Sequence, residues 1–200
     1  MARIDVSRGR LLAAVLALPL LCGSWAAQAE SWGLTDLMQT LARQKAAKAT
    51  FTEKKYLAVV DRPLESSGEL SYTAPDKLEK RTLSPKPETL LLDGDQLSIE
   101  QAGRRRNTIN IQSHPEVAAF VESIRGTLAG DLAALQRYYT LDFSGRADAW
   151  KLVLVPIQPA MRKVMSRIRV DGTDEALTRI VFEQADGDRS EMHIQRLKTP

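Results

Sequence analysis

A succession of short strand patterns, each followed by turn residues, constrains the fold of this chain more than any other feature. Runs rich in Thr, Val, Ile, Leu, Phe and Tyr recur along the chain and are separated by clusters containing Pro, Gly or Asp. This patterning predicts about eleven strands that are joined mostly by hairpins. The strands are expected at residues 49–59, 67–73, 77–83, 90–92, 97–99, 104–111, 139–144, 149–155, 163–171, 176–184 and 190–196.

Asp93-Gly94-Asp95 gives the clearest hairpin signal. Three leucines precede it, and Leu97 and Ile99 follow it. Because Gly adopts positive φ at no steric cost, an Asp-Gly pair between two apolar runs predicts a tight turn. Many consecutive hairpins imply a single curved antiparallel sheet with one concave face.

Two segments have helical periodicity instead. Residues 31–47 predict an amphipathic helix. Residues 115–138 predict a helical pair, which Pro115 opens and Gly130-Asp131 interrupts. Three helical segments are too few to cover the outside of the sheet, so we expect them to cap its concave face. The predicted fold is therefore mainly β with helices (α+β): a curved antiparallel sheet, or incomplete β-barrel, closed by a helical lid over an apolar pocket.

The first residues have the pattern of a secretory signal peptide. Arginines at positions 3, 8 and 10 precede an apolar stretch from Leu11 to about Leu21, and Ala27-Gln28-Ala29 fits the site that signal peptidase cleaves. We expect cleavage after Ala29, which leaves residues 30–200 as one mature domain in the periplasm.

Two alternatives to cleavage are less consistent with the sequence. The apolar stretch is shorter than the ~20 residues that span a bilayer. A lipid anchor on Cys22 would need a small residue before it, and that residue is Leu21. Cys22 is the single cysteine of the chain, so the mature domain is predicted to have no disulfide and no thiolate.

The charge balance argues against nucleic acid as a partner. The whole chain carries a net charge of +3, and loss of three arginines and one aspartate with the leader reduces it to +1. Non-specific binding to nucleic acid needs a strongly basic surface. Arg104-Arg105-Arg106 could dock an acidic partner or anionic lipid headgroups, but solvated charge is also ordinary beside the turn at Gly103.

The sequence contains no local catalytic or metal-binding motif. His114 and His193 are the two histidines, and neither lies in a metal-binding spacing such as H-E-x-x-H. No nucleophile elbow is present. We therefore predict a protein that is not an enzyme and needs no cofactor or metal. A hydrolase site assembled from distant residues remains an alternative.

Several short strings resemble the LolA family of periplasmic lipoprotein carriers, in order and across almost the whole mature chain. They are Phe51-Thr52-Glu53, Gly68-Glu69-Leu70-Ser71-Tyr72, Pro75-Asp76-Lys77-Leu78, Leu92-Asp93-Gly94-Asp95, Leu128-Ala129-Gly130-Asp131, Trp150 to Pro156, and Ile168 to Gly172. The resemblance implies an incomplete β-barrel with a helical lid and a hydrophobic cavity. It also implies carriage of acylated lipoproteins from an inner-membrane transporter to an outer-membrane acceptor.

The chain departs from this family's pattern at the residues that hold the lid. The family usually has an arginine and an aromatic residue where this chain has Glu79 and Lys80, and a glutamine in place of Glu53. In the family that arginine donates hydrogen bonds to helix carbonyls. An ionised carboxylate can only accept, so Glu79 is predicted to change how the lid is held, by pairing with Arg81 or by lying in water. The resemblance is thus to a divergent member, whose cargo could be a lipid or acyl product handed over by an exporter.

These observations predict a monomeric periplasmic carrier that binds acyl chains of a lipoprotein or lipid. Its donor would be an inner-membrane transporter or exporter, and its receiver an outer-membrane acceptor. A periplasmic sensor of the same fold is the alternative. Choosing the inward-facing positions depends on strand register, since a shift of one residue reverses every side chain. The predicted lipid-binding residues are Leu70, Tyr72, Leu90, Leu92, Leu97, Ile99, Phe120, Ile124, Leu128, Leu152 and Leu154.

Overall fold

The computed structural model describes residues 32–101 and 105–197. The predicted leader and its cleavage site lie outside the described residues. Within the described ranges, no helix is both long and apolar enough to cross a membrane.

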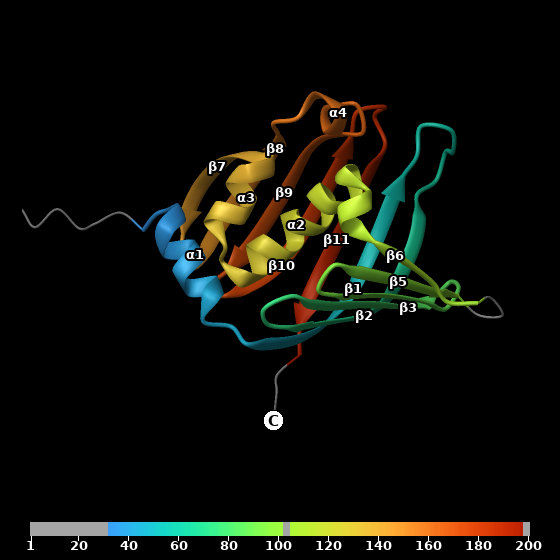
Figure 1. Ribbon diagram of the computed structural model, residues 1–200, viewed down its shortest axis with the longest axis horizontal. Helices are drawn as coiled ribbons and strands as arrows, with labels where there is room; N and C mark the ends of the chain where they lie inside the picture. Colours follow the sequence, from blue (N-terminus) through green and yellow to red (C-terminus); the bar gives the residue numbers. More distant parts are fainter. Residues whose placement is uncertain (1–31, 102–104, 198–200) are drawn as a thin grey trace, which may run out of the picture. The chain divides into compact units, whose positions relative to one another are not determined.

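One antiparallel sheet of eleven strands forms the framework, as the turn spacing predicts (Figure 1). Its spatial order is β6-β5-β4-β3-β2-β1-β11-β10-β9-β8-β7, so β1 lies in the middle and pairs with the last strand. The two outer strands do not pair with each other, and the sheet stays open. The strands are β1 (Ala46–Tyr56), β2 (Leu64–Thr73), β3 (Lys77–Ser84), β4 (Glu88–Asp93), β5 (Gln96–Gln101), β6 (Asn107–Asn110), β7 (Tyr139–Arg146), β8 (Ala149–Pro156), β9 (Met165–Thr173), β10 (Ala176–Gln184) and β11 (Arg189–Arg196).

Helices α1, α2 and α3 lie over one face of this sheet (Figure 1). The helices are α1 (Leu34–Ala42), the short 3₁₀ helix η1 (Ile111–Ser113), α2 (Pro115–Ala129), α3 (Leu132–Tyr138) and α4 (Pro159–Arg162). The single turn α4 was not predicted, because four residues are too few to show a helical period.

The first helix is shorter than its sequence predicts. It ends at Ala42 instead of residue 47, and β1 begins at Ala46. Alanine favours helices locally, but Ala46 and Ala47 form ladder pairs with Thr73 and Tyr72 of β2. Pairing with a neighbouring strand therefore overrides the local helix propensity.

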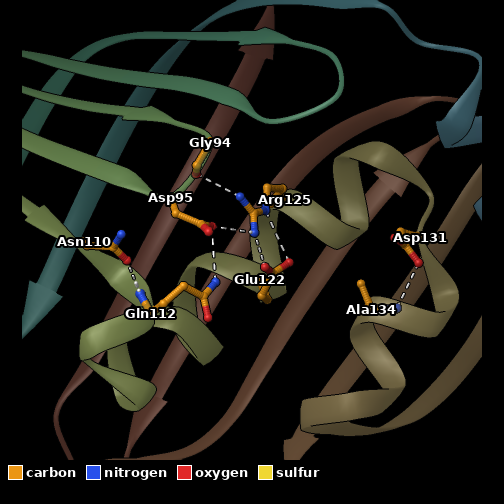
Figure 2. A network of polar contacts seen from close by, with 8 residues as sticks. All are labelled: Gly94, Asp95, Asn110, Gln112, Glu122, Arg125, Asp131 and Ala134. Atoms are coloured by element: carbon orange, nitrogen blue, oxygen red, sulfur yellow. Dashed lines mark hydrogen bonds and ion pairs between the residues drawn. The ribbon is translucent and has the colours of Figure 1, made fainter.

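Gly130 fixes the place where α2 ends and α1 crosses it. Its φ of 65° is the left-handed conformation that ends a helix and that glycine tolerates best. A Cβ on Gly130 would lie 2.1 Å from the carbonyl oxygen of Met38 in α1. Asp131 then caps α3 by accepting a hydrogen bond of 2.8 Å from the backbone N–H of Ala134 (Figure 2).

Two separate apolar clusters attach the helices to the sheet. The larger cluster joins α1, α2 and α3 to strands β8, β9 and β10. The smaller one joins Ile111, Ala118 and Val121 to Leu92 on β4. The helical layer is thus packed against both halves of the sheet.

Candidate functional site

A cavity of about 470 Å³ lies between α2 and the inner face of the sheet. This volume is within the ~300–1,000 Å³ of typical small-molecule pockets. Its lining comes from both halves of the sheet and is mostly aliphatic and aromatic. Phe120 of α2 borders the cavity and is also 38% exposed, so the cavity is open to solvent beside it.

Eight of the eleven predicted lipid-binding residues line this cavity. On the sheet, Tyr72, Leu92 and Leu97 belong to one cross-strand row, which Leu78 completes. The eight residues are Leu70, Tyr72, Leu90, Leu92, Leu97, Phe120, Ile124 and Leu128.

The other three predicted residues do not line the cavity. Leu152 and Leu154 of β8 are fully buried in the larger apolar cluster, packed with residues of α1 and α3. Their side chains face the helices, but at this end of the sheet the helices pack directly on the strands. Ile99 lies on β5 as the cross-strand partner of Leu90 on β4, and it does not line the cavity.

A second cavity wall was missed by sequence reasoning. It is formed by β9, β10 and β11, and its members are Met165, Leu177, Ile180, Phe182, Met192 and Ile194. Met192 and Ile194 alternate with His193 in the sequence, whereas Ile180, Val181 and Phe182 are all apolar and do not show which side chains face inward. Nor was it visible that β11 pairs with β1, which places these strands beside the predicted wall. The rings of Phe120 and Phe182 meet across the cavity with centroids 4.8 Å apart.

Glu53 puts a buried carboxylate on the inner face of the sheet. It lines the cavity and is only 4% exposed. Its oxygens accept hydrogen bonds from Lys80 Nζ at 2.5 Å, Ser190 Oγ at 2.5 Å and Ser66 Oγ at 3.4 Å. Burial by itself raises the pKa of Glu53, but the charge and hydrogen bond of Lys80, together with Ser190, outweigh it and hold the pKa below its ordinary value.

Glu79 is among the residues that border the cavity, but its side chain is directed to the outer face of the sheet. It lies on β3 between Leu78 and Lys80, whose side chains point to the cavity, and successive side chains of a strand point to opposite faces. On the outer face it borders a small depression with Leu91. The predicted pair with Arg81 does not form, because Arg81 contacts Glu69. In the described part of the chain, the side chain of Glu79 has no hydrogen bond or ion pair.

The lid is instead tied to the sheet by Arg125 of α2 (Figure 2). Its Nη1 donates to the carbonyl oxygen of Gly94 at 2.9 Å, in the turn between β4 and β5. Its Nη2 pairs with Asp95 Oδ1 at 3.6 Å and with the buried Glu122 one turn earlier on the same helix. Asp95 also accepts from Gln112 Nε2 at 3.2 Å. Sequence reasoning missed this tie, although Glu122 and Arg125 have the i,i+3 spacing of a helical ion pair.

The two histidines lie outside the cavity. His193 contacts Glu191 at 3.0 Å and His114 lies 4.0 Å from Glu116; both histidine side chains are about half exposed. Across residues 32–101 and 105–197, no three acidic, histidine or cysteine side chains are grouped as a metal site would need. What the cavity offers chemically is apolar surface with a few hydrogen-bond donors.

A family profile described as "Outer membrane lipoprotein carrier protein LolA-like" matches residues 26–194. No curated protein sequence matches the chain. Several solved structures are similar. A LolA superfamily protein from Nitrosomonas europaea has 10% identity and a TM-score of 0.45, over 84% of this chain and 94% of that one. A putative outer membrane lipoprotein-sorting protein domain from Vibrio parahaemolyticus has 10% identity and a TM-score of 0.41, over 84% and 92%. The MucA/MucB complex of Pseudomonas aeruginosa has 13% identity and a TM-score of 0.44, over 84% of this chain and 58% of that one.

Proposed function

The chain belongs to the LolA-like family of outer membrane lipoprotein carrier proteins, and from this premise we propose that it is a periplasmic acyl-chain carrier. It would hold the acyl chains of a lipoprotein or lipid in the cavity under α2. It would receive them from an inner-membrane transporter or exporter and pass them towards an outer-membrane acceptor. The leader, residues 1–29, would direct secretion and be removed.

The apolar cavity is the observation that carries this proposal. Moving a methylene group from water to an apolar site is favourable by ~0.8 kcal/mol. A long acyl chain therefore contributes on the order of 10 kcal/mol before the costs of ordering are subtracted. Binding energy of this size is enough for carriage without any catalytic group.

Release requires a change in the lid. A partner can open the cavity only if it binds the open state more tightly than the closed one. The contacts of Arg125 with the β4–β5 turn are among those that such a partner would have to break, because they join the roof of the cavity to the sheet.

The direct test is to isolate the protein from the periplasm and to identify bound lipids by mass spectrometry. Recovery of stoichiometric acyl lipid supports the proposal. Ile124→Glu should abolish this recovery, because it places a charge in the cavity lining. Val155→Glu is the matched control, because Val155 is 40% exposed on β8 and does not line the cavity.

Two outcomes would contradict carriage. Protein that is empty of lipid and binds no added fatty acid would overturn the proposal. An empty cavity together with a tightly bound periplasmic protein would favour a sensor of the same fold instead.

A further inference from the structure

Two ammonium groups share one carboxylate on the cavity side of the sheet. Lys80 Nζ lies 2.5 Å from one oxygen of Glu53, and Lys55 Nζ lies 3.9 Å from the other. Arg196 also lines the cavity, but it is paired with Glu175 at 2.6 Å. Lys48 and Arg189 line the cavity as well, and Arg189 lies 3.8 Å from Glu191. Lys55 and Lys80 thus bring two positive charges to the single negative charge of Glu53.

Lys80 has hydrogen-bonding capacity to spare. An ammonium group has three donors, and in residues 32–101 and 105–197 only Glu53 accepts from it. Its Nζ also lies 4.9 Å from the centre of the Phe51 ring. The side chain is 24% exposed and lines the cavity, so an oxygen of a bound molecule can reach it.

A second donor in the cavity lining also lacks an acceptor. Gln44 is 9% exposed, and its buried Nε2 has no hydrogen-bond partner. An unsatisfied buried polar group is costly, and a bound molecule that carries acceptor oxygens would remove that cost. The cavity therefore combines apolar walls with unused donors and excess positive charge.

We infer that Lys80 is the polar anchor of the cavity and that the cargo is an acyl chain with an anionic, oxygen-bearing group. This inference rests on the proposed carrier function and specifies its substrate class. The acyl chain occupies the apolar lining, and an oxygen of the anionic group accepts a hydrogen bond from Lys80. A charge-assisted bond of this kind is stronger than a neutral one. Glu53, with Ser66 and Ser190, holds the lysine in place.

Two probes of equal chain length separate the contribution of the head group to the binding affinity from that of the acyl chain. Dodecanoate and dodecanol are titrated into the purified protein by calorimetry. The wild type should prefer dodecanoate by about tenfold. Lys80→Met should bring the ratio of the two affinities close to one while dodecanol binding is retained. Lys54→Met is the matched control, because Lys54 carries the same charge on the outer face and pairs with Glu65.

Lys80→Met leaves Glu53 buried without its main partner and could unfold the protein. The double variant Glu53→Gln/Lys80→Met removes both charges, keeps the two serine contacts possible and leaves the charge of Lys55 in place, so it tests Lys80 without a buried, unpaired carboxylate. Equal affinities of the two probes in the wild type would overturn the anchor but leave carriage intact. An unchanged preference in the folded double variant would do the same. Binding of neither probe would overturn the proposed function and the anchor with it.

Discussion

Glu53 keeps its charge inside an apolar cavity because Lys80, Ser190 and Ser66 surround it with donors. Removing one partner of a buried ion pair lowers the free energy of unfolding much more than replacing both partners by apolar residues, because it leaves the other charge buried and unpaired. Sequence reasoning noted Glu53 as a replacement for a family glutamine, but could not predict its burial. Its neighbours Thr52 and Lys54 are also polar, so the strand pattern alone does not say which of them faces inward.

The lowered pKa of Glu53 predicts a pH-dependent contribution to stability. Its folded pKa lies below the ordinary value of 4.5. The stabilisation is thus fully present above that value and is lost as the pH falls through the folded pKa. The free energy of unfolding of the wild type, minus that of Glu53→Gln, should be constant near neutral pH and decrease below a pH of about 4.5. Urea unfolding at a series of pH values measures this difference, and a difference independent of pH would contradict the assignment.

Among the glycines at the ends of helices, Gly130 is predicted to tolerate substitution least. Gly130→Ala should lower the free energy of unfolding by about 3 kcal/mol, because it adds both backbone strain and a clash with Met38. Gly187→Ala should cost only about 1 kcal/mol, since Gly187 also has positive φ but no atom lies near its missing Cβ. Chemical denaturation of both variants separates strain from crowding. Equal losses would show that the close approach of α1 is unimportant.

At the scale of elements, α2 is the roof of the cavity and the part that the proposed carriage requires to move. Its inner side carries Phe120, Ile124 and Leu128, and Arg125 ties it to the β4–β5 turn. The helix and the Asp-Gly turn were each predicted from the sequence. Their contact was not, because it joins residues 31 positions apart, and helical or strand periodicity carries no information about such pairs.

Arg125→Met is predicted to loosen the lid. It removes the bond to Gly94 and the pair with Asp95, so a bound fluorescent fatty acid should dissociate about tenfold faster, the effect of roughly 1.4 kcal/mol. Stopped-flow displacement measures the rate. Arg137→Met on α3 is the matched control, because Arg137 is exposed and lies outside the tie. The double variant Glu122→Gln/Arg125→Met shows whether a buried, unpaired Glu122 is responsible for any unfolding.

Glu79→Arg distinguishes the two accounts of the lid. The sequence suggested a role for this position, but its side chain lies on the outer face of β3. The substitution should therefore leave the dissociation rate unchanged. A slower rate in Glu79→Arg, with no change in Arg125→Met, would mean that the lid is held from the strand and not from α2.

At the scale of the whole molecule, the sequence predicted the class of fold better than the composition of the cavity. Turn clusters and alternation were enough for eleven strands, a helical pair and a lid. The pairing of β1 with β11 brings together the two ends of the domain, and no local pattern encodes it. This pairing creates the second cavity wall, and the same long-range packing explains why Leu152 and Leu154 are core residues and not lining residues.

A carrier of this architecture should gain stability from its cargo, because a ligand that binds only the folded state stabilises it by mass action. At a free fatty acid concentration of about 100 times the Kd, the wild type should gain ~2.7 kcal/mol. Ala49 lines the cavity and is 8% exposed, so Ala49→Phe should fill part of the space and reduce this gain. Thermal unfolding with and without fatty acid measures both. The control is Ala149→Phe, at an exposed position of β8, which should leave the gain unchanged. A full gain in Ala49→Phe would place the bound chain outside the cavity, on some other surface of the sheet or helices.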